Sequence, residues 1–67
     1  MRYGGNVMKV LAGGKFLVRT DAGVEILAQL AGDVRRSGEK LEVGDRVSLT
    51  LSPTNPSQGL IMSREAS

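Results

Sequence analysis

The sequence predicts a small all-β fold in which five short strands close into a barrel. Apolar and polar residues alternate with a period of two over several short runs, which is the pattern of a strand with one buried face. Turns that contain glycine separate these runs. The chain has only 67 residues and no long helical pattern that could cover an open sheet, so closure is the way to bury the apolar face.

Three strands are expected in the first half of the chain, at about 6–12, 15–20 and 24–30. Gly13-Gly14 is a hairpin-turn signal between the first two. In the second run Phe16 and Val18 share the buried face, so a core position is favoured for Phe16 over a base-stacking one. In the third run the residues expected on one face are Val24, Ile26, Ala28 and Leu30, with Leu27 on the other.

A short helical connection is expected after the third strand. Asp33 could cap it, Val34 would face inward and Gly38 would end it after one or two turns.

Two further strands complete the pattern, at about 46–51 and 59–64. Val47, Leu49 and Leu51 alternate inward in the first of them. Pro53 and Pro56 cannot donate to a strand ladder, so residues 52–57 are expected to form a loop.

Three strands, a short helix and two strands is the order of a five-stranded OB-fold barrel. We therefore expect residues 1–67 to form a single OB-fold domain. A small open sheet and an SH3-like barrel are the alternatives.

Composition argues against catalysis and against bound cofactors. The chain has no Cys and no His, which excludes a thiolate or imidazole metal site. Asp21 and Glu25 flank a turn, and Glu39 and Glu42 lie beside Lys40, so solvated turn charges are favoured over a catalytic carboxylate pair. We expect no catalytic residues, no metal, no cofactor and no small-molecule substrate. No apolar run is long enough to span a membrane, and a cytoplasmic monomer is expected.

The positions of the basic residues indicate nucleic-acid binding more than the net charge of +2 does. The outer face of an OB barrel receives single-stranded nucleic acid, and guanidinium groups suit phosphates. The predicted RNA-binding residues are Lys15, Arg19, Arg35, Arg36, Lys40, Arg46 and Arg64. The alternative is that these are ordinary solubilising charges, and the scarcity of aromatic residues supports it.

A series of motifs resembles bacterial translation initiation factor 1, which implies an S1-like OB fold, in register and without an insertion from residue 5 to residue 64. The motifs are Gly5-Asn6-Val7, Phe16-Leu17-Val18, Ala22-Gly23, Ala31-Gly32-Asp33-Val34-Arg35-Arg36, Gly44-Asp45-Arg46-Val47, Leu51-Ser52-Pro53, Ser57-Gln58-Gly59-Leu60-Ile61 and Arg64.

The resemblance implies a protein that binds the small ribosomal subunit at the decoding or A site during initiation. Its implied partners are 16S ribosomal RNA, a neighbouring ribosomal protein and the other initiation factors. By resemblance, Arg35 and Arg36 match the basic pair that contacts ribosomal RNA, and Lys40, Arg46 and Arg64 match further basic positions of the family.

The chain also departs from the family pattern. Gly38 and Glu39 replace an aromatic and an aliphatic residue, Gln58 and Leu60 replace two basic positions, Ser63 replaces an aromatic, and Asp33 replaces a lysine. Fewer phosphate contacts would lower RNA affinity and its salt dependence. Two alternatives stand beside the first. Residues 15–47 also resemble the N-terminal OB domain of the small-subunit-maturation GTPases, and the departures favour a diverged, ancestral-like or engineered barrel with weak or no specific RNA binding.

Overall fold

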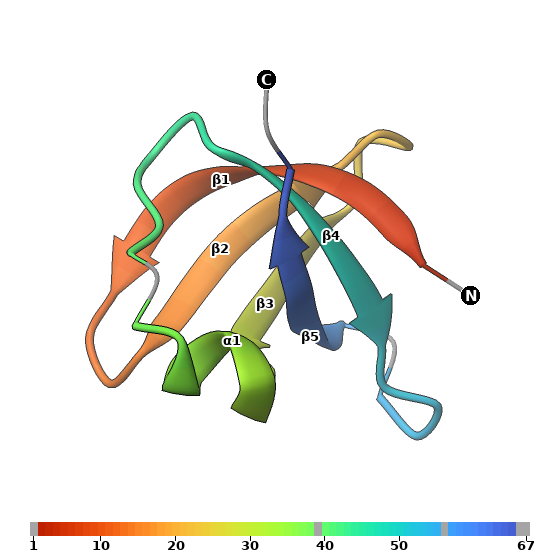
Figure 1. Cartoon of the computed structure of the whole chain (residues 1–67). Helices are drawn as coiled ribbons and strands as arrows, with labels where there is room; N and C mark the ends of the chain where they lie inside the picture. The colour runs from red at the N-terminus through yellow and green to blue at the C-terminus, as the bar shows by residue number, and fades with distance from the viewer. Residues whose placement is uncertain (1, 39, 56, 66–67) are drawn as a thin grey trace.

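The computed structural model describes residues 2–38, 40–55 and 57–65, and for Asp33 it describes the backbone alone. Its elements follow the predicted order (Figure 1). They are β1 Tyr3–Leu11, β2 Lys15–Thr20, β3 Glu25–Leu30, α1 Gly32–Arg36, β4 Arg46–Leu51 and β5 Gln58–Arg64.

The strands close into a barrel in the order β1-β2-β3-β5-β4, which confirms the predicted five-stranded barrel. All neighbouring strands are antiparallel except β3 and β5, which are parallel. β1 pairs with β2 along most of its length and with β4 through its first four residues. A register shift between Val7 and Lys9 bends it between the two partners, as bulges do at barrel corners.

The core is the inner face of these strands together with one residue of the α1–β4 connection. Its buried members are Val7, Phe16, Val18, Ile26, Ala28, Leu41, Val47, Leu49 and Ile61, with Leu30 and Leu51 packed partly buried against them. The core position expected for Phe16 is therefore confirmed, and Leu27 faces outward as expected.

Val24 was expected on the buried face, and that prediction is wrong. Its side chain is 53% exposed, and β3 begins one residue later. The backbone explains the difference, because Thr20 and Val24 close the β2–β3 turn. The amide of Thr20 donates to the carbonyl of Val24 at 2.8 Å, and the amide of Val24 donates to Thr20 Oγ1 at 3.2 Å.

β1 begins three residues before its predicted start, because two glycines lie inside the strand rather than before it. A Cβ on Gly5 would lie 2.8 Å from the carbonyl oxygen of Arg19 and 2.8 Å from a methyl carbon of Val18. Glycine at this position therefore permits the close approach of β1 and β2, one of the roles that glycine has within a strand.

The short helix α1 is present, but Asp33 is not the residue that precedes it. The helix begins at Gly32, and the amide of Arg35 donates to the carbonyl of Ala31 at 2.9 Å, so the cap position is Ala31. Ala31 is the single residue between β3 and α1, and its amide donates to the carbonyl of Ile61 on β5 at 2.9 Å. Val34 is buried as expected.

Gly38 ends the helix as predicted. Its φ of 73° is a left-handed conformation, and its amide donates to Arg35 at 3.2 Å. The predicted β4–β5 loop is also present for its described residues, and Pro56 lies outside them. Among the described helices, none has the length and apolar character that a membrane span requires.

Candidate nucleic-acid interface

The predicted RNA-binding residues lie toward two ends of the barrel. The helix end comprises α1 and the β1–β2 turn, and the turn end comprises the β2–β3 turn, the start of β4 and the end of β5 (Figure 1). Lys15 begins β2 and Arg19 lies four residues along it, roughly 13 Å away at the usual strand rise. The alternation of the strands indicated outward side chains, but it did not assign them to an end.

At the turn end the three arginines, Arg19, Arg46 and Arg64, are all paired with carboxylates. Arg19 lies 3.5 Å from Glu25, and Arg64 lies 3.6 Å from Asp45. We call this set the paired arginines.

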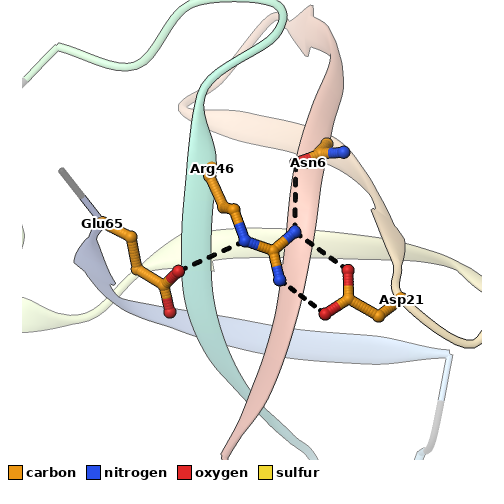
Figure 2. Close-up of polar contacts among 4 residues, drawn as sticks. All are labelled: Asn6, Asp21, Arg46 and Glu65. Atoms are coloured by element: carbon orange, nitrogen blue, oxygen red, sulfur yellow. Dashed lines mark hydrogen bonds and ion pairs between the residues drawn. The ribbon is translucent and has the colours of Figure 1, made fainter. Parts of the chain in front are cut away.

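Arg46 has the largest set of partners, which Figure 2 shows. Its Nη1 and Nη2 donate to the two carboxylate oxygens of Asp21 at 2.9 and 2.5 Å. Its Nη1 also donates to Asn6 Oδ1 at 3.4 Å, and its Nε lies 3.3 Å from Glu65 Oε2.

These pairs change the electrostatics of the turn end. The hydrogen bond from Arg46 holds the pKa of the Asp21 carboxyl below its ordinary value of 3.8, and the same bond raises the pKa of Arg46. The three paired arginines face four carboxylates, those of Asp21, Glu25, Asp45 and Glu65, so these side chains together carry a charge of −1. Such a surface does not attract phosphate by charge alone.

The helix end presents cations of a different kind. Lys15, Arg35 and Lys40 are exposed and form no ion pair within the described part of the chain. Arg36 Nε donates to the carbonyl of Gly32 at 3.4 Å. We call Lys15, Arg35 and Arg36, together with Lys40 of the α1–β4 connection, the helix-end cluster.

Arg35 connects this cluster to the β1–β2 turn. A Cβ on Gly14 would lie 3.8 Å from Arg35 Nη2, so the guanidinium lies close to the turn backbone. Gly14 has a φ of 75°, the left-handed conformation that favours glycine in a turn. Lys15 follows at once, so the helix and the hairpin bring Arg35 and Lys15 to the same end of the barrel.

A groove of about 400 Å³ lies beside Lys15 on the outer surface. Its lining comes from β2, β3, β4, β5 and the β4–β5 loop: Lys15, Leu27, Ala28, Gln29, Thr50, Leu51, Ser52, Pro53, Gln58, Gly59 and Leu60. Leu27 and Leu60 are 42% and 46% exposed, and the lining contains no carboxylate. The second and third strands and the β4–β5 loop are the parts of an OB barrel that bind oligonucleotides.

Lys9 is a further candidate that the sequence reasoning did not include. It lies opposite Leu17 on β2, and Leu11 lies opposite Lys15, so the two lysines are diagonal neighbours on the outer face. Such neighbours are about 7–8 Å apart. Lys9 is exposed and forms no ion pair among the residues that the structure covers. The register shift next to it obscures the alternation that would have indicated its face.

Among the described residues, no three carboxylates gather as metal ligands would.

Comparisons with known proteins agree with the barrel geometry. The sequence profile described as "Proteasomal ATPase OB C-terminal domain" matches residues 5–52, so most of the chain is an OB domain of that family. YjeQ from Thermotoga maritima is a structural neighbour with a TM-score of 0.80 and 30% identity. The match covers 98% of this chain and 23% of YjeQ.

Three further relatives share a name. "Translation initiation factor IF-1, chloroplastic" of Tetradesmus obliquus is 38% identical over 60 residues, which are 90% of this chain and 59% of that protein. "Translation initiation factor IF-1 2" of Cupriavidus pinatubonensis is 34% identical over 61 residues, which are 91% of this chain and 84% of that protein. The solution structure of translation initiation factor 1 from the Wolbachia endosymbiont strain TRS of Brugia malayi has a TM-score of 0.79 and 32% identity. That match covers 100% of this chain and 78% of the other.

The chain thus spans less than two thirds of the chloroplastic relative but most of the Cupriavidus and Wolbachia proteins. With this identity over this share of both chains, the protein belongs to the translation initiation factor IF-1 family.

Proposed function

We propose that the protein binds RNA of the small ribosomal subunit at the decoding or A site during translation initiation, and that it acts by occupying this site rather than by catalysis. Family membership supports the role in initiation. The observation that carries the RNA-binding part is the position of cations that have no ion pair among the described residues. Lys15 lines the groove, and Arg35 lies at the adjoining β1–β2 turn.

The chemistry of this surface suits an RNA strand. Lys15, Arg35 and Lys40 can neutralise phosphates without first releasing a carboxylate of the described residues. Arg35 can form the bidentate contact that guanidinium makes with a phosphate. The groove supplies the apolar side chains of Leu27 and Leu60 for the flat faces of bases or riboses.

The groove lining contains no aromatic residue, so the contact relies on phosphates more than on base stacking. Stacking on an aromatic side chain contributes about 1–3 kcal/mol per base. We therefore expect affinity that depends strongly on salt and weakly on RNA sequence.

The paired arginines have a smaller part in this proposal. A phosphate that approached Arg19 or Arg64 would meet the carboxylate already beside it, Glu25 or Asp45, and would be repelled by that charge. The helix-end cluster makes the first contact, and Arg19 and Arg64 add to it only where the RNA extends to the turn end. The partners in this proposal are 16S ribosomal RNA, a neighbouring ribosomal protein and the other initiation factors, with the protein acting as a cytoplasmic monomer.

Binding to purified small ribosomal subunits at two salt concentrations tests the proposal. We expect saturable binding that weakens with salt and that falls in the Arg35→Ala/Arg36→Ala variant. The matched control, Arg19→Ala/Arg64→Ala, removes the same charge from the turn end and should bind more tightly than the helix-end variant. Absence of binding at low salt would reject the function, and equal binding by the two double variants would reject the surface.

A second candidate is an RNA-binding module that works inside a larger protein, as the resemblance to the small-subunit-maturation GTPases implied. The likeness to 23% of the YjeQ chain favours it, because the barrel occurs there as part of a longer protein. Competition separates the two candidates. A bacterial initiation factor of this family should displace the protein from small subunits under the first proposal and should not displace it under the second.

A further inference from the structure

We propose that Arg46 is a positioning residue that holds the closing seam of the barrel together, and that it does not bind RNA. The seam is the contact between β1 and β4. It is short, since only Tyr3–Asn6 of β1 pair with Arg46–Leu49 of β4 in the strand ladder. The Arg46 side chain lies at one end of this seam, opposite Asn6.

The contacts of Arg46 join four segments that are distant in the sequence. Asn6 lies on β1, Asp21 lies in the β2–β3 turn, Arg46 begins β4, and Glu65 follows β5 (Figure 2). Backbone bonds accompany these contacts, because the amide of Asp21 donates to Gly4 at 3.0 Å and the amide of Glu65 donates to Arg46 at 2.8 Å. We call Asn6, Asp21, Arg46 and Glu65 the Arg46 cluster.

The ion pair also packs directly against the backbone of β1. A Cβ on Gly4 would lie 2.7 Å from Arg46 Nη2 and 2.8 Å from Asp21 Oδ2. Any side chain at this position would therefore push the pair away from the strand. The absence of a side chain on Gly4 therefore leaves room for the Arg46–Asp21 pair beside β1.

The guanidinium of Arg46 is also poorly available to a phosphate. Each of its three nitrogens has an oxygen acceptor: Nε has Glu65, Nη1 has Asp21 and Asn6, and Nη2 has Asp21. An incoming phosphate would meet two carboxylates around one guanidinium. The Arg46 side chain is 41% exposed, so the carboxylates around it and not burial set it apart from Arg35, which has no ion pair among the described residues.

Two substitutions separate the positioning role from ligand binding. Arg46→Lys keeps the charge but replaces the planar fork with a single ammonium, which cannot hold both oxygens of Asp21 and reach Glu65. We expect a lower urea midpoint, and we expect the Asp21 carboxyl to titrate closer to 3.8, as followed by NMR. An unchanged midpoint and an unchanged titration of Asp21 would overturn the proposal.

Arg46→Met removes the charge and tests RNA binding, and this arm rests on the proposed function. One phosphate contact contributes about 0.7–0.9 to the slope of log affinity against log salt. For binding to small ribosomal subunits, Arg46→Met should lower this slope by less than that amount. The control Arg35→Met should lower the slope by the full value of one contact and keep the wild-type urea midpoint. A decrease of about 0.7–0.9 in Arg46→Met would overturn the proposal. If the wild-type protein fails to bind, the proposed function fails, and the stability and titration of Arg46→Lys still decide the role of Arg46.

Discussion

Replacing Lys15 and Arg35 together by glutamine should flatten the salt dependence of RNA binding without unfolding the barrel. Both side chains are exposed at the helix end, and neither has an ion pair among the residues described. Each phosphate contact contributes about 0.7 for single-stranded and about 0.9 for double-stranded nucleic acid to the slope of log affinity against log salt. Removing two contacts should therefore lower the slope by about 1.4–1.8.

The size of this effect makes it measurable. Raising the salt concentration from 50 to 200 mM should weaken the binding of both proteins. By the same slopes, the factor of weakening should be about 7 to 12 times larger for the wild-type protein than for the double variant. The assay is equilibrium binding to small ribosomal subunits at four or more salt concentrations, with the urea midpoint of each variant as a check on folding.

The matched control is Arg19→Gln/Arg64→Gln, which removes the same net charge from the turn end. Since both arginines are paired with carboxylates, the slope should fall by less than the value of one phosphate contact. An equal decrease of slope in the two double variants would refute the reasoning, because net charge alone would then explain binding. A decrease confined to the control would place the RNA at the turn end instead.

The remaining predictions concern stability. Gly59→Ala places a Cβ 2.5 Å from a backbone oxygen of β4. Gly13→Ala meets no atom within 4 Å and adds only the strain of a φ of 77°. Urea unfolding should therefore show the larger loss of stability for Gly59→Ala, and the reverse order would contradict the steric account. Ile61→Ala empties a fully buried position and should lower the free energy of unfolding by about 2–5 kcal/mol. Leu60→Ala, at the exposed neighbouring position, should change it by no more than about 0.5 kcal/mol. Similar losses in the two variants would disprove the core assignment. Because the folded pKa of Asp21 is below its ordinary value of 3.8, its contribution is present above that pH and is lost as the pH falls through the lower folded value. Urea midpoints measured from pH 6 to pH 2 should therefore fall more steeply for the wild-type protein than for Asp21→Asn, and parallel curves would show that this carboxyl contributes nothing.

Local pattern alone was enough for β2, for β4 and for the barrel. The run 46–51 alternates without a break, the run 15–20 alternates except at Leu17, and the structure has strands at both. Alternation also placed Phe16 in the core, because a period of two assigns every second side chain to one face. Closure followed from the lack of any long helical pattern to cover the apolar face.

Long-range pairing decided the rest. Glycines that look like strand breaks lie within β1, because the backbone of β2 approaches Gly5 too closely for any side chain. The groove forms where β3 and β5 run parallel, and the residues that pair there, such as Leu27 and Gln58, are far apart in the chain.

The distribution of charge is the clearest case. Alternation shows that a basic side chain points outward, but it does not show which carboxylate will lie beside it. Asp21 and Arg46 are 25 residues apart and meet only because closing the barrel brings the β2–β3 turn to the start of β4. The sequence alone therefore determined that the protein is a small barrel with cations on its outer surface. Only the tertiary structure decided which of the described cations lie beside carboxylates, because ion pairs form across the sheet and not along the chain.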